Sequence, residues 1–462
     1  MTDSAVRLAE AEREIFSRRP EDAIVPTLDR IAALATLLGD PQRACPVIHV
    51  TGTNGKTSTA RMTETLLRAR GLRTGLYTSP HLSSLRERIC LDGEPLSPED
   101  FVAAHDDVAP YAALVDGQQA VRLSFFEMLT AMAFAAFADA PVDVAVIEVG
   151  LGGTWDATNI ADGQVAVVTP VALDHTAYLG GTVEAIATEK AGIIKPGAVA
   201  VLARQPDAAA RALARRAAEV SVPVRAEGTD FGVTSRELAV GGQQLEISGL
   251  NGNYPDLLLP LFGAYQAQNA ACALAAVEAF AGTGPLDGDL VRHAFAAMTA
   301  PGRLEVVRRS PVVIVDSAHN PAGMAVSVEA VTEAFGFRTL VAVLAVSADK
   351  DVAGMLEELE PAADRLVVTH NAASRSMDPQ ELQRLAAGLF GPDRVVVAPR
   401  LDDAIEVATA LADEASDAAA PGGAGILITG STTTAGEARL LLGAAGVLAG
   451  GAPDGSTEGT VP

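Results

Sequence analysis

The stretch VIHVTGTNGKTSTA, residues 47–60, places a short apolar run directly before a glycine-bearing turn and a pattern with helical spacing. The common phosphate-binding loop reads G-x-x-x-x-G-K-[ST]. Here the glycine that precedes the Gly-Lys-Thr at 55–57 is Gly52, three positions back, so the loop is shorter than the common form. Residues 47–50 are predicted to form a strand and residues 57–70 a helix. A turn between a strand and a helix is the context that phosphate binding requires.

The turn has two interpretations. Backbone N–H groups that converge at a helix N-terminus bind anions. In that geometry Lys56 would reach the β- and γ-phosphates of a nucleotide, and the Thr57 hydroxyl would ligate Mg²⁺. The alternative is a tight strand-to-helix turn with a surface lysine. The context favours a nucleotide, but it does not identify a reaction.

Composition places the chain among globular proteins with large buried cores. The 462 residues are 49% hydrophobic and 20% charged, and the length predicts two or three domains. A net charge of −24 disfavours nucleic-acid and anionic-membrane surfaces, which require basic patches. Three well-separated cysteines indicate neither a disulfide framework nor a zinc site. The charged N-terminus lacks an apolar signal segment, and the apolar stretches are too short to span a bilayer. We therefore expect a cytoplasmic protein without nucleic-acid or membrane partners.

Runs of β-forming residues alternate with alanine-rich helical runs from residue 46 onward. This alternation predicts an α/β fold with a parallel sheet and helices on both faces. The predicted strands are 47–50, 142–148, 164–168 and 198–202, and the predicted helices are 57–70, 125–138, 183–191 and 208–219. Residues 229–260 differ, because Gly241-Gly242 lies between two short strand-like runs and predicts a local antiparallel hairpin.

The alternation restarts after Pro301-Gly302, which we interpret as the boundary between two α/β domains. The predicted strands of the second domain are 312–315, 340–344, 366–369, 395–397 and 425–428. We assign residues 1–300 to the first domain and residues 301–448 to the second. Residues 449–462 are rich in Gly, Pro, Ser and Thr and are expected to be disordered.

The loop T-G-T-N-G-K-T resembles that of the Mur ligase superfamily, ATP-dependent ligases that join a carboxylate to an amino acid. Within it, the chain is similar over nearly its whole length to the dihydrofolate synthase/folylpolyglutamate synthase family. The matching stretches are YTSPHL at 77–82, SFFE at 124–127, IEVGLGGTWDATN at 147–159, ALDHTAYLG at 172–180, EKAGIIK at 189–195, PGR at 301–303 and DSAHNP at 316–321. The resemblance implies a P-loop-type Mur ligase central domain, which binds ATP and folate, followed by a smaller Rossmann-like α/β domain.

The resemblance implies an ATP site with contributions from both domains. Its nucleotide contacts would be Gly52, Thr53, Asn54, Gly55, Lys56, Thr57, Asn269, Arg303 and Asp316, and its catalytic residues Lys56, Lys190 and His319. From the residues alone, Asn269 would be a helix cap or a surface residue. Arg303 alone could form a salt bridge at the domain boundary.

Several candidate metal ligands follow predicted strands. Glu148 ends a strand at the C-terminal edge of the sheet, where α/β proteins bind ligands, and a carboxylate suits Mg²⁺. His175 alone would be an ordinary loop histidine. The resemblance implies that two Mg²⁺ ions are held by Thr57, Ser79, Glu148, His175 and Lys190.

Lys190 lies in the helical run VEAIATEKAGI, and its spacing alone favours a solvated helix lysine. The family carries a carbamylated lysine at the EKAG position, which would turn a cation into an anionic oxygen ligand for a second Mg²⁺. Carbamylation requires a neutral amine, and a nearby Mg²⁺ would disfavour the ammonium form by repulsion. Lys190 is therefore either a solvated helix lysine, as its spacing favours, or a carbamylated metal ligand, as the resemblance implies.

The resemblance also implies a pteroate pocket with an aromatic wall that suits stacking on a flat pterin. Its residues would be Leu28, Asp29, Arg30, Thr78, Pro80, His81, Phe125, Phe126, Glu127, Thr154, Trp155 and Asp156. The alternative for residues 125–127 is a core aromatic pair followed by an acid that the helix dipole favours. Thr154 stands where many relatives carry arginine, and Ser317 stands where glycine or alanine is commoner.

The implied activity is ATP-dependent ligation of L-glutamate to dihydropteroate and to reduced folates. ATP would convert the acceptor carboxylate to an acyl phosphate, from which the glutamate amine displaces phosphate. Lys56, Mg²⁺ and Arg303 would position the groups and neutralise charge. The resemblance favours a monomer, and residues 348–351 are a candidate glutamate site.

Two alternative functions remain. A muramyl ligase would place a UDP-sugar-binding domain before the ATP loop. Here the loop starts at residue 51, which leaves room for only one or two helices. A non-catalytic nucleotide-gated regulator would have no pocket for a second substrate. The many candidate acceptor and metal residues disfavour that class.

Overall fold

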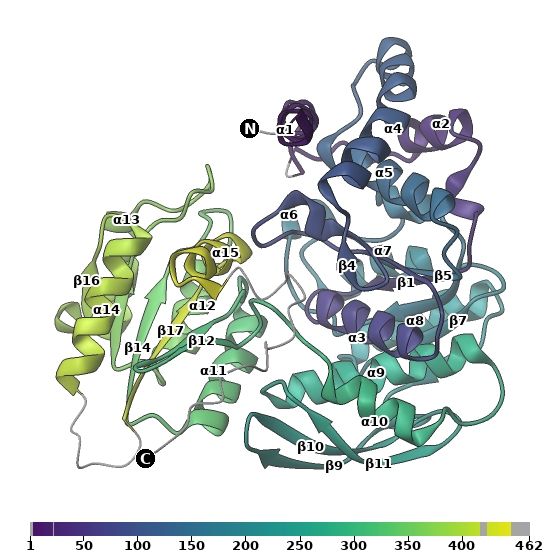
Figure 1. Ribbon diagram of the computed structural model, residues 1–462. Helices are drawn as coiled ribbons and strands as arrows, with labels where there is room; N and C mark the ends of the chain where they lie inside the picture. Colours follow the sequence, from purple (N-terminus) through teal and green to yellow (C-terminus); the bar gives the residue numbers. More distant parts are fainter. Residues whose placement is uncertain (1–2, 22, 416–422, 445–462) are drawn as a thin grey trace, which may run out of the picture. The chain divides into compact units, whose positions relative to one another are not determined.

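The computed structural model describes residues 3–21, 23–415 and 423–444 (Figure 1). Contacts between Cα atoms group the chain into two compact units, Met1–Pro301 with Asn320–Gly336, and Gly302–His319 with Phe337–Pro462. The chain therefore passes from one unit to the other after residues 301, 319 and 336. The tail at 449–462, which was expected to be disordered, lies outside the described residues.

The described part of the first unit contains an eight-stranded sheet in the order β4-β3-β2-β5-β1-β6-β7-β8. Its strands are β1 (Val47–Thr51), β2 (Thr74–Tyr77), β3 (Ile89–Leu91), β4 (Glu94–Pro95), β5 (Val144–Glu148), β6 (Gly163–Val168), β7 (Val199–Leu202) and β8 (Val224–Ala226). Neighbours from β2 to β8 are parallel, and β3 and β4 add an antiparallel edge. The four strands predicted in this region are confirmed.

Helices cover both faces of this sheet, as the alternation predicted (Figure 1). In the first unit they are α1 (Asp3–Phe16), α2 (Asp29–Leu37), α3 (Lys56–Ala69), α4 (Pro98–Gln118), α5 (Phe125–Asp139), α6 (Thr176–Leu179), α7 (Val183–Lys190), α8 (Asp207–Glu219), α9 (Ala264–Ala281), α10 (Gly288–Ala296) and α11 (Pro321–Phe335). One core packs α3 and α9 against Ile48 and Val50 of β1, and another packs α4 and α5 against Val47. Two cores arise because successive side chains of a strand point to opposite faces.

The predicted hairpin is confirmed and continues into a third strand. β9 (Gly232–Ala239), β10 (Gly242–Ser248) and β11 (Asn253–Leu259) form an antiparallel sheet in which β10 is central. Leu245 of β10 lies opposite Leu257 of β11, and both side chains are buried in the core that contains α9. This small sheet therefore packs against the core that contains α9.

The described part of the second unit contains a six-stranded sheet in the order β12-β13-β17-β14-β15-β16. Its strands are β12 (Glu305–Arg309), β13 (Val312–Val315), β14 (Thr339–Leu344), β15 (Arg365–Val368), β16 (Val395–Val397) and β17 (Ala424–Thr429), and its helices are α12 (Val352–Leu359), α13 (Pro379–Phe390), α14 (Leu401–Ala415) and α15 (Thr432–Leu441). The five predicted strands are confirmed and run parallel. β12, which is antiparallel to β13, was not predicted because its sequence EVVRR has too few apolar residues.

Across both units, every described helix is either too short or too polar to cross a lipid bilayer.

Candidate active site

The loop between β1 and α3 begins where a side chain does not fit. A Cβ atom on Gly52 would lie 1.8 Å from Thr169 Oγ1, and the φ angle of Gly52 is 149°. This strand end therefore requires glycine. The N–H groups of Thr53 and Asn54 both donate to Pro170 O, at 3.0 and 3.3 Å. These bonds fix the loop on the segment that follows β6.

Helix α3 begins at Lys56, and its N-cap residue is Gly55. In the described chain, no side chain provides a capping hydrogen bond at this end. An uncapped N-terminus presents N–H groups and the positive end of the helix dipole to an anion. Lys56 is half-buried, and its Nζ donates to Thr53 O at 3.1 Å. The loop therefore has the geometry of a phosphate site.

Glu148 ends β5 and joins two of the predicted metal-binding residues. Its side chain is 1% exposed. Oε1 accepts a hydrogen bond from the Thr57 hydroxyl at 2.9 Å, and Oε2 accepts one from the Ser79 N–H at 3.2 Å. β1 and β5 are adjacent parallel strands, so their C-terminal ends meet at one edge of the sheet. The structure thus brings Thr57, Ser79 and Glu148 into one oxygen-rich cluster.

His175 lies before the short helix α6, with its backbone in the left-handed region at a φ of 50°. Its side chain is 37% exposed, and Nε2 lies 3.8 Å from Asp174 Oδ1. Over the described ranges, no three His, Cys, Asp or Glu side chains are grouped so as to hold a metal ion. The oxygen donors of Thr57 and Glu148 nevertheless fit Mg²⁺, because this hard cation takes few protein ligands and completes its shell with phosphate and water.

Lys190 is the last residue of α7, and it is 3% exposed. Its Nζ donates to Gly52 O at 2.7 Å. Burial, and then repulsion by Lys56, lowers the pKa of Lys190 from 10.5 to about 7, although nearby carboxylates oppose the shift. The interpretation of Lys190 as a solvated helix lysine is therefore wrong. A large share of this amine is neutral near pH 7.

Asn269 is buried within α9, so its interpretation as a cap or a surface residue is also wrong. Its Nδ2 donates to Gln266 Oε1 at 3.1 Å. Its Oδ1 is close enough to the loop that it would lie 2.5 Å from a Cβ atom on Gly55. Asn269 therefore lies directly against the last residue of the loop before α3.

The N-terminus of α5 is held by a capping box and a buried ion pair. Glu127 N–H donates to Ser124 Oγ at 3.2 Å, and Ser124 N–H donates to Glu127 Oε2 at 2.7 Å. Arg30 Nε donates to Glu127 Oε1 at 3.0 Å. Arg30 and Glu127 are both buried. Both carboxylate oxygens of Glu127 are thus engaged within the protein, and they join α2 to α5.

The two phenylalanines that open α5 have different neighbours. The guanidinium carbon of Arg88 lies 5.0 Å from the centroid of the Phe125 ring. The ring centroids of Phe126 and Tyr77 are 5.8 Å apart. Arg88 Nε also donates to His81 Nδ1 at 2.9 Å. Burial, and then the charge of Arg88, lowers the pKa of His81 to about 3, so this imidazole is neutral. Arg88 therefore brings His81 and Phe125 together.

The segment around Thr154 lies beside α7. The Thr154 hydroxyl donates to Glu189 O at 3.0 Å, and the Trp155 N–H donates to Glu189 Oε1 at 3.4 Å. Asp156 is buried and accepts a hydrogen bond from Thr158 N–H at 3.0 Å. Burial raises the pKa of Asp156 to about 6. Predicted acceptor residues thus contact the helix that ends at Lys190.

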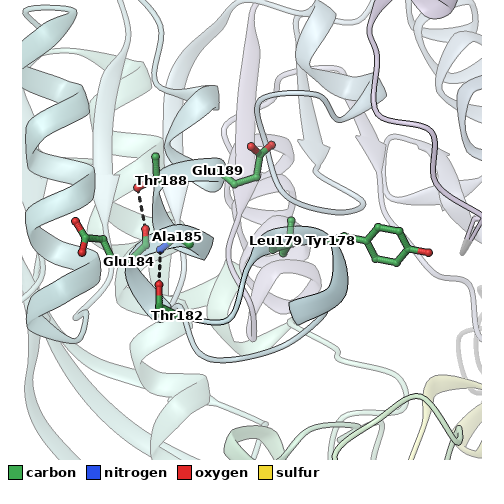
Figure 2. Close-up of a pocket in the computed structure, with 7 residues that line it drawn as sticks. All are labelled: Tyr178, Leu179, Thr182, Glu184, Ala185, Thr188 and Glu189. Atoms are coloured by element: carbon green, nitrogen blue, oxygen red, sulfur yellow. Dashed lines mark hydrogen bonds between the residues drawn. The ribbon is translucent and has the colours of Figure 1, made fainter.

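A pocket of about 440 Å³ opens beside α6 and α7 (Figure 2). It is lined by Tyr178, Leu179, Thr182, Glu184, Ala185, Thr188 and Glu189. These residues were not among the predicted site residues. Glu189 connects the pocket to the acceptor segment, because it bonds to Thr154 and Trp155.

The three predicted residues of the second unit flank β12 and β13. Arg303 precedes β12, and Asp316 directly follows β13. Asp316 is buried, and its Oδ2 accepts a hydrogen bond from Leu304 N–H at 2.9 Å. His319 Nδ1 lies 3.0 Å from Ser317 O. Arg303 and Asp316 are therefore at the same end of the β12–β13 pair.

Known proteins resemble this chain in sequence over most of its length. Residues 113–277 match the Mur ligase middle domain, and residues 302–432 match the glutamate ligase domain of Mur ligases. The dihydrofolate synthase/folylpolyglutamate synthase of Mycobacterium tuberculosis (strain ATCC 25618 / H37Rv) is 50% identical, over 96% of this chain and 95% of the relative. The chain belongs to the dihydrofolate synthase/folylpolyglutamate synthase family.

Solved structures of this synthase family have the same fold. Mycobacterium tuberculosis folylpolyglutamate synthase complexed with ADP matches with a TM-score of 0.92 and 51% identity, over 96% of this chain and 99% of that one. E. coli FolC in complex with DHPP and ADP matches with a TM-score of 0.82 and 29% identity, over 96% and 100%. The chain is therefore an ATP-dependent ligase of the folate–glutamate class, and the muramyl and regulatory alternatives are set aside.

Two residues that were not predicted from the sequence contact predicted site residues. One is Arg88, which bonds to His81 and lies over the Phe125 ring. The other is Asn320, whose Oδ1 accepts from Asn54 Nδ2 at 3.2 Å and whose Nδ2 donates back to Asn54 Oδ1 at 3.1 Å. Asn320 also donates to Asp174 and caps α11. The Asn-Pro pair at 320–321 is a helix-start signal that indicates the cap. The pairing with Asn54, 266 positions away, has no sequence signal.

Proposed function

We propose that this protein joins L-glutamate to dihydropteroate and to reduced folates through an acyl phosphate. The observation that carries this proposal is the cluster in which Glu148 bonds both to Thr57 of the nucleotide loop and to Ser79 of the YTSPHL stretch. A single carboxylate thus links the nucleotide loop to a predicted acceptor segment. That link is what a ligase needs, because the γ-phosphate and the acceptor carboxylate must meet.

The chemistry needs activation, because a carboxylate has a poor leaving group. A carboxylate oxygen of the acceptor attacks the γ-phosphorus of ATP, and ADP leaves. The glutamate amine then attacks the acyl carbon, loses a proton and displaces phosphate, which leaves an amide. Lys56 would neutralise charge on the transferred phosphoryl group. Arg303 and His319 would contribute from the second unit, together with the nucleotide contact Asp316.

Magnesium fits the donor set at the sheet edge. We assign Thr57, Ser79, Glu148 and His175 to Mg²⁺. The Thr57 hydroxyl and the Glu148 carboxylate are adjacent oxygen donors, and Ser79 is held beside them by its N–H. Bound there, Mg²⁺ would neutralise phosphate charge. His175 would complete the set from the loop that precedes α6.

Lys190 is proposed as a carbamate. A neutral Nζ would attack CO₂ and lose one proton, which gives an anionic group with two oxygens. The buried position of Nζ against Gly52 O supports this proposal, because a carbamate formed there would lie beside the nucleotide loop and would serve a second Mg²⁺. Mass measurement of the native protein under CO₂ and in CO₂-free buffer tests this assignment. An unmodified lysine under both conditions would contradict it.

The acceptor pocket is assigned to the segments that meet around α5 and α7. Residues 28–30, 78–81, 125–127 and 154–156 would form it, with the aromatic rings available for stacking and with Arg30 and Glu127 fixing the wall. We further propose that residues 1–300 form the ATP- and folate-binding domain and residues 301–448 the glutamate-ligating domain. By resemblance, the protein would act as a cytoplasmic monomer.

The deciding experiment is an assay of ADP release by the purified protein. Dihydropteroate and tetrahydrofolate are supplied as alternative acceptors, each with and without L-glutamate. Release that requires both an acceptor and glutamate supports the ligase, and the two acceptors separate the dihydrofolate synthase from the folylpolyglutamate synthase activity. ADP release that is indifferent to both substrates would overturn the proposal.

A further inference from the structure

The turn that carries Arg303 has an unusual backbone. The residues on either side of it, Gly302 and Leu304, have φ angles of 66° and 47°. Leu304 is buried, and a bulky residue at positive φ is a genuine outlier. Such strain persists only where the surrounding contacts over-determine the conformation, and it concentrates at functional sites. Specific contacts must therefore hold this turn in place.

Three side chains of the second unit hold the backbone of the turn. Gly302 N–H donates to Glu305 Oε2 at 2.7 Å, and Gly302 O accepts from the Ser317 hydroxyl at 2.8 Å. Leu304 N–H donates to Asp316 Oδ2 at 2.9 Å. Ser317 and Asp316 are both buried. The backbone is thus fixed on both sides of Arg303.

A fully buried arginine lies behind this arrangement. Arg439 of α15 is 0% exposed, and its Nε donates at 2.7 Å to Glu305 Oε2, the same oxygen that accepts from Gly302. Its Nη2 also donates to Ala444 O at 3.4 Å. Arg439 is the fully buried member of this ion pair, and the Glu305 side chain is 22% exposed. Removing Glu305 would therefore leave the buried guanidinium without its counter-charge. Arg439 therefore determines where the Glu305 carboxylate lies.

We propose that Glu305 and Arg439 are positioning residues for Arg303, and that they hold its guanidinium in the place where it meets the phosphates of ATP. The inference rests on the nucleotide role proposed above for Arg303. Neither residue needs to touch ATP, because both act through Gly302. Positioning of this kind matters in phosphoryl transfer, where the protein contributes mainly orientation and charge.

The experiment is a double-mutant cycle between Arg439→Gln and Arg303→Ala, with ADP release measured as kcat/KM for ATP. In the parent background, Arg439→Gln is expected to lower kcat/KM roughly 10- to 100-fold, since a displacement near 1 Å can have that effect. In the Arg303→Ala background, it should lower kcat/KM by no more than about 2-fold. Residues that act as a unit show this non-additivity.

A matched control separates positioning from general stability. Arg394 forms an ion pair with Glu360 at 2.6 Å elsewhere in the second unit, so Arg394→Gln removes an ion pair of similar length at a more exposed position. It should lower the melting temperature and leave kcat/KM for ATP within about 2-fold of the parent. If Arg439→Gln does not fold, Ser317→Ala and Glu305→Gln repeat the cycle with smaller changes to the same turn.

The outcomes distinguish the nucleotide role of Arg303 from the positioning roles of Glu305 and Arg439. If Arg303→Ala keeps the parent kcat/KM, the nucleotide role of Arg303 fails and the inference fails with it. If Arg303→Ala is impaired, and the foldable turn variants lower kcat/KM equally in both backgrounds, only the positioning inference is overturned. An effect confined to the background that retains Arg303 supports it.

Discussion

Two loops of the molecule leave their sheets in the same way and then diverge. The sequences are TGTNGKTS at 51–58, after β1, and TGSTTTAG at 429–436, after β17. Each strand lies between two parallel neighbours. Each is followed by a glycine with no room for a Cβ atom, which would lie 1.8 Å from Thr169 Oγ1 at Gly52 and 2.4 Å from Ala345 O at Gly430. Both strand ends therefore require glycine after the threonine.

The helices that follow differ at their first turn. α15 starts directly after Ser431, whose Oγ accepts a hydrogen bond from Thr434 N–H at 3.0 Å. α3 starts after the extra residues 53–55 and has no side-chain cap within the described chain. The Ser431 hydroxyl satisfies one N–H group at the start of α15, whereas the N-cap residue of α3 is a glycine, which has no side chain to accept such a bond. The cap, and not the glycine, distinguishes the proposed phosphate loop from its structural counterpart.

The greatest loss of activity is expected at Lys56, because the loop at 429–436 has no lysine. Lys56→Ala should lower ADP release about 1,000-fold with either acceptor, because it removes charge from the phosphoryl group in transfer. Thr433→Ala, at an exposed position of the other loop, should keep the parent rate. Circular dichroism checks that both variants are folded. Parent-like turnover of a folded Lys56→Ala variant would remove the phosphate role.

The second effect compares the two strand-end glycines. Gly52→Ala and Gly430→Ala should each lower the free energy of unfolding by about 1–3 kcal/mol, because both force a displacement in a packed region. Only Gly52→Ala is expected also to lose affinity for ADP, since its displacement reaches the nucleotide loop. Urea unfolding and calorimetric titration with ADP measure the two quantities. Equal losses of ADP affinity would show that the loops are not functionally distinct.

The third effect concerns Lys190, which bonds to the first of these loops. Its pKa is about 7 in the folded protein against an ordinary 10.5, so between these values the unfolded chain binds more protons than the folded one. The unfolding free energy of the parent should therefore rise with pH from 7 toward 10.5, relative to Lys190→Met, by at most about 1.4 kcal/mol per pH unit. Unfolding of both proteins in CO₂-free buffer from pH 7 to 9 tests this. A difference that is independent of pH would contradict the buried-amine assignment.

A more modest change in stability is expected at the capped start of α15. Ser431→Ala removes the cap of α15 and should lower the unfolding free energy by about 1 kcal/mol. Thr433→Ala removes a hydroxyl two positions further on and should change it by less than about 0.5 kcal/mol. Both values come from urea unfolding. If the two variants are equally stable, Ser431 does not stabilise the helix end.

Apolar patterning predicted the strands that form the centres of both sheets. Runs such as 47–50 and 312–315 are buried on both faces, so their composition alone indicates a strand. Thr74–Tyr77 was not recognised, because glycine within so short a run argues against a strand. Pairing with β5 outweighs that weak local preference. The edge strand β12 was missed because its pairing with β13 is not encoded in its own composition.

The site was predictable at its motifs and not at its long-range contacts. Helical spacing around Lys190 reports only the geometry of α7. The contact that buries Lys190 is with Gly52, 138 positions earlier in the chain. Asn269 is similar, because its position inside α9 says nothing of the loop that it touches. Sequence reasoning without such contacts therefore favoured solvated positions for residues that are buried.

The three passages of the chain between the units set the boundaries for any recombination between relatives. Helix α11 lies between two segments of the second unit in sequence, yet it groups with the first. There its Phe335 ring lies 4.8 Å from Phe262, and its Glu333 accepts from Arg236 at 2.8 Å. A chimera joined only at Pro301 would take α11 from one parent and its packing surface from the other. A compatible exchange of ligase domains requires three junctions, with residues 320–336 inherited together with the nucleotide loop.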